Sequence, residues 1–375
     1  MALLARAREL EAAGRDIVHM EIGEPDFSTP RPVREAVARV LADGALHYTP
    51  ACGLPALREA IARHYAERFG ARVEPDQVVV TPGASGALLL VLGVLVERDA
   101  EVLMTDPGYP CNRHFARFIE ARARSVPVDE ATGFQMDTAL LEAHWGPATA
   151  VALVASPANP TGTLIAPGEL EAMAAAARDR GGWLVVDEIY QHLVYGREPA
   201  SVLSRTSEVF VINSFSKYFS MTGWRVGWLV APREYVPALD RLAQNLFLAA
   251  PTPSQHGAVA ALGAPCAEIL EAQRAEFAAR RDFLVPALRE LGFGIPVTPE
   301  GAFYVYADCS RFTDDSLAFC RRLLEEAGVA VTPGCDFGRH RAQTHVRFAY
   351  TTSMDRLQEG VRRLAAFLEG RRKTP

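Results

Sequence analysis

Lys217 is the side chain of this sequence best suited to act as an amine nucleophile. Only two of the 39 basic residues are lysines, Lys217 and Lys373, and the others are arginines. A guanidinium group stays protonated, whereas a lysine amine can lose its proton and attack a carbonyl carbon. Lys373 lies in the charged C-terminal tail, where we expect a solvated group. Lys217 lies in mid-chain and is a candidate Schiff-base residue, with an ordinary surface lysine as the alternative.

Two stretches of sequence carry groups that hold a phosphate. Ser214, Ser216 and Arg225 surround Lys217, and hydroxyl and guanidinium groups both bind phosphate oxygens. Thr81-Pro-Gly-Ala-Ser-Gly86 is a turn that opens a helical run, so its free N–H groups and the helix dipole favour an anion. The turn matches neither G-x-G-x-x-G nor a P-loop with its lysine, which argues against those nucleotide sites. An ordinary capped helix and a strand-edge arginine are the alternatives.

Polar side chains also follow other apolar runs. Asp187 ends the run Trp183-Leu-Val-Val-Asp187, where a half-buried carboxylate needs a partner such as a cationic ring nitrogen. Tyr190 follows three residues later and shares the same end of the run. Asn159 lies in a turn fixed by two prolines, and a rigid amide suits a hydrogen bond to a ligand oxygen. A helix N-cap, core packing and an Asn-Pro turn are the respective alternatives.

An aromatic residue and an arginine complete the set. Tyr109 follows Asp-Pro-Gly at a turn, where it can stack on a planar ligand or pack in the core. Arg347 lies in the apolar segment Val-Arg-Phe-Ala-Tyr, where a charge needs a partner. A ligand carboxylate held by both guanidinium nitrogens explains it, and a structural salt bridge explains it equally well.

The elements that must position these residues follow an α/β pattern with a mostly parallel sheet. Strands are predicted over 77–81, 101–105, 149–155, 183–187, 208–213 and 226–231, and helices over 85–96, 167–180, 233–248 and 264–291. A smaller α+β part follows, with strands over 302–307, 329–332 and 345–350 and helices over 316–327 and 354–368. Since ligands bind beyond the carboxyl ends of parallel strands, the loops that carry the candidate residues should converge on one crevice.

Composition narrows the class of protein. The chain has 375 residues, is 49% hydrophobic and has a net charge of −6, which is typical of a globular protein and does not favour a nucleic-acid partner. The longest apolar run is too short to span a bilayer, and the N-terminus has no secretory signal pattern, so we expect a cytoplasmic protein without a membrane partner. Its six scattered cysteines predict free thiols, and their spacing gives little support to a zinc site.

Taken together, these residues resemble the class I/II pyridoxal-phosphate (PLP) aminotransferases of fold type I. The resemblance runs from Ile22-Gly-Glu-Pro-Asp-Phe27 to Val346-Arg-Phe348. Its most specific element is Ser-Phe-Ser-Lys217 followed by Met-Thr-Gly-Trp-Arg-Val-Gly227. Asn-Pro-Thr-Gly and Val-Asp-Glu-Ile-Tyr190 occur in the right order. The resemblance implies a large PLP-binding domain at 31–280, a small C-terminal domain at 281–375, and an N-terminal segment at 1–30 that joins the small domain.

The resemblance also implies a role for each candidate residue. Lys217 would form the Schiff base with PLP and then move protons, and Asp187 would pair with the pyridine nitrogen. The ring hydroxyl would bind Tyr190 and Asn159, the ring would stack on Tyr109, and the phosphate would bind Ala84, Ser85, Ser214 and Arg225. Arg347 would bind the substrate α-carboxylate with help from the Gly23 backbone and Asn159. Tyr48 would reach the phosphate of the neighbouring subunit's cofactor, so a homodimer with shared active sites is implied.

The resemblance leaves the reaction partly open. The leading hypothesis is ping-pong transfer of an amino group from an L-amino acid to 2-oxoglutarate or pyruvate. A PLP-dependent C–S β-lyase acting on cysteine conjugates would use the same residues. A PLP-binding regulatory module would have an added basic domain, which the net charge of −6 does not favour. A nicotinamide dehydrogenase would have a G-x-G-x-x-G motif after its first strand, and this motif is absent. Arg31, Arg113 and Arg339 are all candidates for a side-chain carboxylate, and with no means of choosing among them we expect a neutral or aromatic donor.

Overall fold

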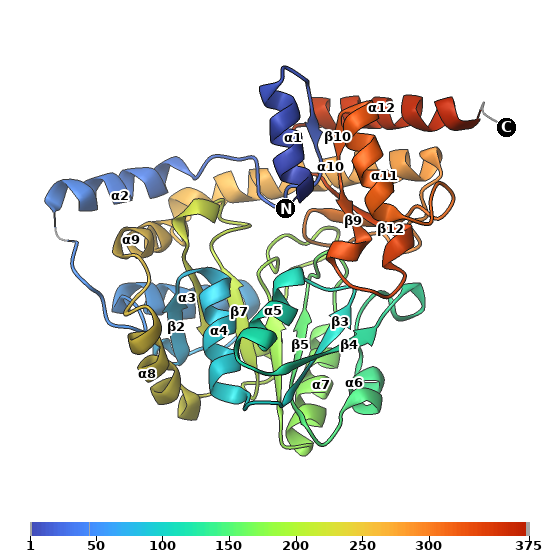
Figure 1. The fold of residues 1–375 in the computed structure, drawn as a ribbon. Helices are drawn as coiled ribbons and strands as arrows, with labels where there is room; N and C mark the ends of the chain where they lie inside the picture. The colour runs from blue at the N-terminus through green and yellow to red at the C-terminus, as the bar shows by residue number, and fades with distance from the viewer. Residues whose placement is uncertain (1, 45, 373–375) are drawn as a thin grey trace.

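A seven-stranded sheet forms the centre of the larger part of the molecule (Figure 1). The structure is a computed structural model that describes residues 2–44 and 46–372; Lys373, predicted to be solvated, lies outside the described residues. The strand order is β2-β8-β7-β6-β5-β3-β4. The strands are β2 (Val78–Thr81), β3 (Glu101–Asp106), β4 (Arg122–Pro127), β5 (Thr149–Ala155), β6 (Trp183–Asp187), β7 (Phe210–Ser214) and β8 (Gly227–Val230). Only β8 runs antiparallel to its neighbours in this sheet, so the predicted mostly parallel sheet is confirmed.

Helices cover both faces of this sheet. They are α3 (Pro55–Phe69), α4 (Gly83–Leu95), α5 (Pro110–Phe118), α6 (Thr138–His144), α7 (Pro167–Asp179), α8 (Val236–Leu246) and α9 (Thr252–Ala261). Successive strand side chains point to opposite faces, so Val185 packs in the hydrophobic cluster of α4 and α8, while Leu184 and Val186 pack in that of α3 and α7. Because both faces are buried, the central strands are continuous apolar runs, which is why the sequence pattern located them well.

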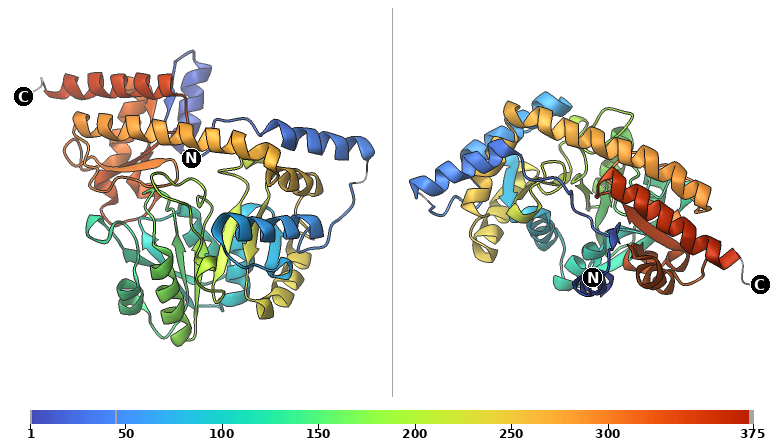
Figure 2. Two further views of the ribbon diagram at one scale, coloured as in Figure 1. Left: turned by 180° about the vertical axis from the view of Figure 1, so that it is seen from behind. Right: turned by 90° about the horizontal axis from the view of Figure 1, so that it is seen from above.

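The smaller part of the molecule combines both ends of the chain. An antiparallel sheet contains β9 (Tyr304–Asp308), β12 (His345–Ala349) and β11 (Thr332–Pro333), and β1 (Val18–His19) pairs in parallel with β10 (Val329–Ala330). The helices here are α1 (Ala2–Ala12), α11 (Ser316–Arg322) and α12 (Met354–Arg372). The long helix α10 (Ala264–Leu291) joins the two parts, because it packs on α12 at one end and on α2 (Arg31–Asp43) and α9 at the other (Figure 2).

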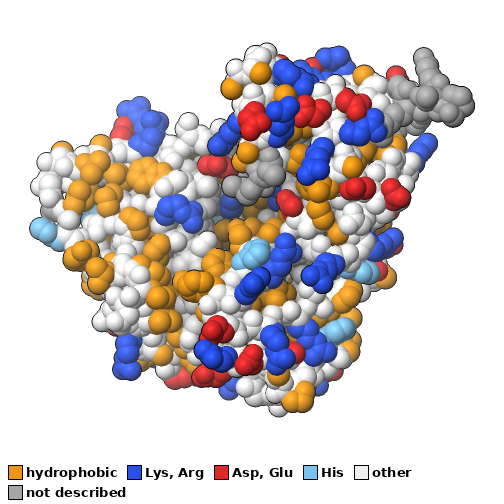
Figure 3. All heavy atoms as spheres, viewed as in Figure 1, with side chains coloured by type: hydrophobic (Ala, Val, Ile, Leu, Met, Phe, Trp, Pro, Cys, Tyr) orange, Lys and Arg blue, Asp and Glu red, His pale blue; other side chains and the backbone are white. Residues whose placement is uncertain are grey.

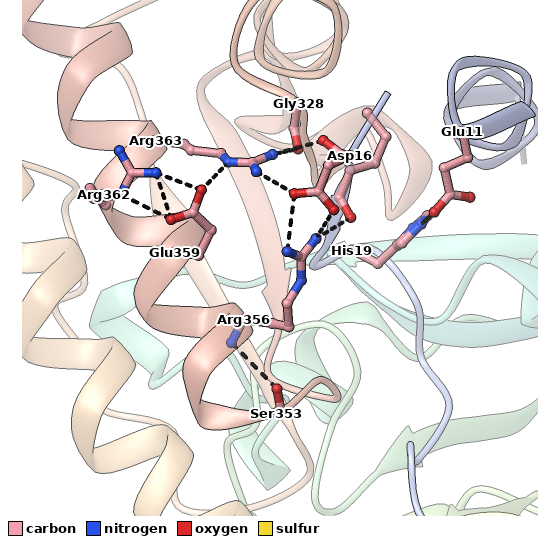
Figure 4. A network of polar contacts seen from close by, with 10 residues as sticks. Glu11, Asp16, His19, Gly328, Ser353, Arg356, Glu359, Arg362 and Arg363 are labelled. Atoms are coloured by element: carbon pink, nitrogen blue, oxygen red, sulfur yellow. Dashed lines mark hydrogen bonds and ion pairs between the residues drawn. The ribbon is translucent and has the colours of Figure 1, made fainter. Parts of the chain in front are cut away.

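Ion pairs hold the N-terminal segment against α12. The carboxylate of Asp16 accepts hydrogen bonds from Arg356 and Arg363, and the guanidinium of Arg356 also donates to the carbonyl of Ile17 (Figure 4). His19 lies between the carboxylates of Glu11 on α1 and Glu21 on the segment that follows β1. These contacts fix the course of the chain just before Gly23, which enters the candidate site.

Several predicted boundaries differ from the structure for identifiable reasons. The strand predicted over 329–332 is divided between two sheets, because the chain leaves β10 and joins β11 within four residues. The helix predicted over 316–327 changes to π-helical geometry at Leu323. The helix predicted over 233–248 begins later as α8, with Pro237 in its first turn. The sequence prediction missed β4, whose exposed, charged positions on the sheet edge lack an apolar run.

Candidate functional site

One cavity of about 310 Å³ lies where the loops after β2, β3, β5, β6 and β7 meet. The structure brings eleven of the predicted site residues to its wall: Gly23, Ala84, Ser85, Tyr109, Asn159, Asp187, Tyr190, Ser214, Lys217, Arg225 and Arg347. The strands are parallel there, so their carboxyl ends share one edge of the sheet, as the sequence pattern predicted. Gly23 and Arg347 reach the cavity from the smaller part of the molecule.

The amine of Lys217 faces the N-terminal segment inside this cavity. Its Nζ donates a hydrogen bond of 2.6 Å to the carbonyl oxygen of Gly23. Burial lowers the pKa of the Lys217 amine to about 8. The carboxylate of Glu24 opposes this shift, and the guanidinium groups of Arg347 and Arg225 add to it. Near neutral pH a useful fraction of such an amine is unprotonated, which an ordinary surface lysine does not offer.

Asp187 is a buried carboxylate at the end of β6. Its Oδ1 accepts a hydrogen bond of 3.0 Å from the backbone N–H of Ile189, in a turn and not at the start of a helix as the N-cap alternative required. Burial raises the pKa of Asp187 to about 6, and the Ile189 N–H and the nearby Lys217 partly oppose this rise. A ligand cation against the cavity-facing carboxylate would restore its ionised form.

The first turn of α4 and the loop around Arg225 form a cradle for an anion. Gly83 has a φ of +72°, and a Cβ added there would lie 2.6 Å from Arg225 Nη2. Arg225 itself has a left-handed backbone, with a φ of +52°, and lies in the turn before β8. The turn brings its guanidinium against the N-terminus of α4, and not to the strand edge that the sequence left open as an alternative. The Ser214 hydroxyl donates to Ser216 Oγ at 2.9 Å.

Arg347 is a buried guanidinium whose partners are all uncharged. Its Nη1 donates to Asn159 Oδ1 at 2.9 Å and its Nη2 to the carbonyl of Glu21 at 2.7 Å. Its Nε is buried without a partner among the described residues. The structural salt bridge that the sequence allowed is therefore absent from the described part of the chain. A buried cation that lines a cavity without a carboxylate partner is suited to bind the carboxylate of a ligand.

Tyr304 is a cavity residue that the sequence interpretation missed. Its hydroxyl lies 2.8 Å from the hydroxyl of Tyr190, and its ring centroid lies 4.2 Å from Arg347 Cζ. β9 and β12 are paired, and Tyr304 lies on the same face of this sheet as Arg347, diagonally across the register. The alternation of Tyr304 and Tyr306 marked one face of a strand, but the sequence did not reveal that this face meets Arg347.

A second cavity, of about 580 Å³, adjoins the first and shares Gly23, Tyr109, Asn159, Thr222 and Arg347 with it. Most of its further lining is apolar and includes Leu3 and Leu4 of α1, Ile22, Leu317, Val331 and Phe337. Arg113 also lines it, with Nη2 donating to the carbonyl of Asp336 at 3.0 Å. The other two arginines proposed for a carboxylate lie outside the described lining of both cavities, and Arg31 pairs with Glu35 on α2.

Tyr48 lies apart from the cavity of its own chain. It is 83% exposed and borders a surface groove formed with residues 249–253. The structure thus separates Tyr48 from the other predicted site residues within one chain.

All six cysteines are free, and the described part of the chain has no cluster of three or more metal-ligating side chains. None of the described helices combines the length and apolar character needed to cross a bilayer.

Known proteins resemble the chain over almost its full length. The pattern of the family described as aminotransferase class I and II matches residues 15–364. A valine–pyruvate aminotransferase of Mycobacterium tuberculosis is 40% identical, over 96% of this chain and 94% of that protein. An aspartate/prephenate aminotransferase of Thermus thermophilus is 36% identical, over 98% and 95%. The crystal structure of an aminotransferase from M. tuberculosis superposes with a TM-score of 0.95 at 39% identity, covering 99% of this chain and 96% of that one.

Proposed function

The chain belongs to the class I and II aminotransferases, and we propose that it transfers the amino group of a neutral or aromatic L-amino acid to a 2-oxo acid. Enzymes of this class use PLP, so the chain is a PLP-dependent transaminase of fold type I. One observation carries the assignment to this cavity. An amine with a lowered pKa, Lys217, and a guanidinium without a carboxylate partner in the described chain, Arg347, line the same space.

The residues present fit this cofactor. Asp187 offers a buried carboxylate, at the end of β6, to a protonated ring nitrogen. The α4 N-terminus at Ala84 and Ser85, with Ser214 and Arg225, would hold the phosphate, and Gly83 leaves the guanidinium of Arg225 room to approach. Tyr190 and Asn159 would hydrogen-bond the ring hydroxyl oxygen, and Tyr109 would stack on the ring.

The chain's own groups then divide the work of the reaction. PLP, when bound, supplies a carbonyl carbon for the substrate amine and a ring that takes up the electron pair released at the substrate Cα. Arg347, with Asn159 and the backbone of Gly23, would orient the substrate carboxylate. Lys217, once free and neutral, would accept the proton from Cα. Asp187 would keep a proton on the ring nitrogen, and that positive charge stabilises the electrons that the ring accepts.

The second cavity supports a neutral or aromatic donor. A substrate whose carboxylate is held by Arg347 would extend its side chain toward this space, where Leu3, Leu317 and Phe337 provide apolar contact. The relatives are named for valine and pyruvate and for aspartate and prephenate, so their names alone do not decide the donor. Arg113 is the described arginine in position to meet a second carboxylate, and we assign it to the dicarboxylic acceptor 2-oxoglutarate.

A homodimer would complete the site. Apolar side chains with more than a third of their surface exposed gather near the groove that contains Tyr48, and Figure 3 shows hydrophobic side chains on this side of the molecule, over α2, α8 and α9. They are Leu41, Leu46, Tyr48, Leu246 and Leu248. Covering such a patch with a second copy of the chain would bury it and bring Tyr48 to the partner's phosphate cradle. Six free thiols favour a reducing compartment, and we place the enzyme in the cytoplasm.

Steady-state kinetics with a panel of donors test this proposal. We expect higher kcat/KM values for valine, leucine, methionine or phenylalanine than for aspartate or glutamate, with parallel lines in double-reciprocal plots because the mechanism is ping-pong. A preference for aspartate would contradict the donor assignment. Release of pyruvate and ammonia from a cysteine conjugate without any acceptor, faster than transamination, would indicate a β-lyase instead.

A further inference from the structure

We propose that Tyr304 is a positioning residue that links the carboxylate-binding Arg347 to Tyr190, so that a substrate carboxylate changes how strongly Tyr190 holds the cofactor's ring oxygen. This inference rests on the proposed function of the cavity. Tyr304 belongs to β9 and Tyr190 follows β6, so folding brings together two residues that are 114 positions apart in the chain.

The two phenol groups form a short chain of donors. The hydroxyls of Tyr190 and Tyr304 lie 2.8 Å apart and both are buried. Burial raises the pKa of both hydroxyls, so each keeps its proton. Among the described residues, Tyr190 is the one hydrogen-bond partner of the Tyr304 hydroxyl. When Tyr190 donates its own proton to a ligand oxygen, Tyr304 can donate to Tyr190, and a phenol that accepts a hydrogen bond is a stronger donor.

Arg347 acts on this pair of hydroxyl groups through the ring of Tyr304. The guanidinium carbon lies 4.2 Å from the centre of the Tyr304 ring and 4.8 Å from the centre of the Phe337 ring. A cation over an aromatic face draws on its electron density, which makes the Tyr304 hydroxyl more acidic and a better donor. A carboxylate bound to Arg347 compensates that charge, so the donation from Tyr304 to Tyr190 weakens.

Gly23 keeps Tyr304 in place. A Cβ at Gly23 would collide with the Tyr304 hydroxyl, so the backbone there lies directly against the phenol. The carbonyl of the same Gly23 accepts the hydrogen bond from Lys217. Tyr304 therefore contacts both Arg347 and Tyr190. It also lies beside Gly23, whose carbonyl accepts the hydrogen bond from the amine.

The test is a spectroscopic pH titration of the PLP-loaded enzyme. Tyr304→Phe keeps the ring under Arg347 and removes only the hydroxyl. In the wild type, the hydrogen bond from Tyr304 strengthens the hold of Tyr190 on a negative ring oxygen. Because the variant lacks this bond, we expect the apparent pKa of its visible band to rise by roughly 0.3 pH unit. Isovalerate, a carboxylate without an amine, should raise this pKa in the wild type and raise it less in Tyr304→Phe.

Two further variants separate this role from a structural one. Tyr306→Phe removes another buried hydroxyl from the same strand, one without a partner among the described residues, and should titrate as the wild type does. In a Tyr190→Phe background, Tyr304→Phe should cause no further shift, because its route to the ring oxygen is gone. A Tyr304→Phe enzyme with the wild-type pKa and isovalerate response would overturn the inference. A wild-type protein without any visible band would instead overturn the proposed function, and the inference with it.

Discussion

The Nζ of Lys217 lies 2.6 Å from the carbonyl oxygen of Gly23, although 194 positions separate the two residues in the chain. The contact closes the candidate site, because Gly23 belongs to the N-terminal segment that pairs with β10 and is anchored to α12 through Asp16. The N-terminus and the smaller part of the molecule therefore hold one wall of the cavity, and the large sheet supplies the amine on the other.

Lys217→Arg should abolish transamination. Arginine keeps the positive charge but has no amine with a pKa near 8, so we expect kcat/KM to fall by at least roughly 1000-fold. Borohydride reduction followed by peptide mass spectrometry should find the cofactor on the Lys217 peptide of the wild type and on no peptide of the variant. Lys373→Arg, at the other lysine of the chain, is the matched control and should retain full activity. Near-native turnover in Lys217→Arg would disprove the assignment.

Asp187→Asn should separate binding from catalysis. The variant keeps a similar shape but cannot stabilise a proton on the ring nitrogen, so turnover should fall by roughly 100-fold or more while PLP still binds. Equilibrium binding of PLP, followed by absorbance, and single-turnover rates measure the two effects. Unchanged turnover would remove Asp187 from its assigned role.

Arg113→Leu should change acceptor choice. If Arg113 holds the second carboxylate of 2-oxoglutarate, its loss should lower kcat/KM for that acceptor by about tenfold and leave pyruvate within about twofold. Arg31→Leu, on the exposed surface of α2, is the control and should affect neither acceptor. An equal loss for both acceptors would mean that Arg113 acts on the fold rather than on the substrate.

A histidine pair, buried at His192 and partly buried at His64, predicts loss of stability in acid. His64 Nε2 and His192 Nε2 lie 2.7 Å apart, and burial lowers the pKa of His64 to about 4 and also lowers that of His192. Because the unfolded chain binds protons below about pH 6.5, stability should fall as the pH drops from about 6.5 toward 4, by about 2 kcal/mol at pH 5 for His64.

Thermal unfolding at several pH values measures this effect. His64→Gln removes the titrating group, so its melting temperature should fall less between about pH 7 and pH 5 than that of the wild type. His114→Gln, at an exposed position of α5, should leave the pH dependence unchanged. A wild-type slope in His64→Gln would contradict the assignment of the acid sensitivity to this pair.

Mixing two inactive variants tests the shared site. Tyr48→Ala would remove a phosphate contact from the partner's cavity, and Lys217→Arg would remove the amine from its own. In a hybrid dimer, one site would have an intact Lys217 and receive Tyr48 from the other subunit. Co-refolded variants in equal amounts should therefore recover about a quarter of wild-type activity. No recovery despite hybrid formation would argue against the crossed arrangement.

The sequence predicted the parts of the site that depend on local signals. Asp187 and Asn159 could be found because each follows a continuous apolar run, and parallel strands bring such ends together. Arg347 stood out as a charge in an apolar strand, but only the structure showed that no described carboxylate pairs with it. The position of Tyr304 in the site depends on the register between β9 and β12, and that of Leu3 depends on how α1 lies over the second cavity. Neither contact has a local pattern that would predict it.

The absorption spectrum of the purified protein, with PLP and then with single L-amino acids in the absence of any acceptor, is the most direct test of the central claim. We predict a visible band that fades to a band at shorter wavelength when valine or another neutral donor is added, and returns when a 2-oxo acid follows. The Lys217→Arg variant should lack that response. A wild-type band that persists with every amino acid, or no band after PLP is added, would contradict an aminotransferase site at Lys217.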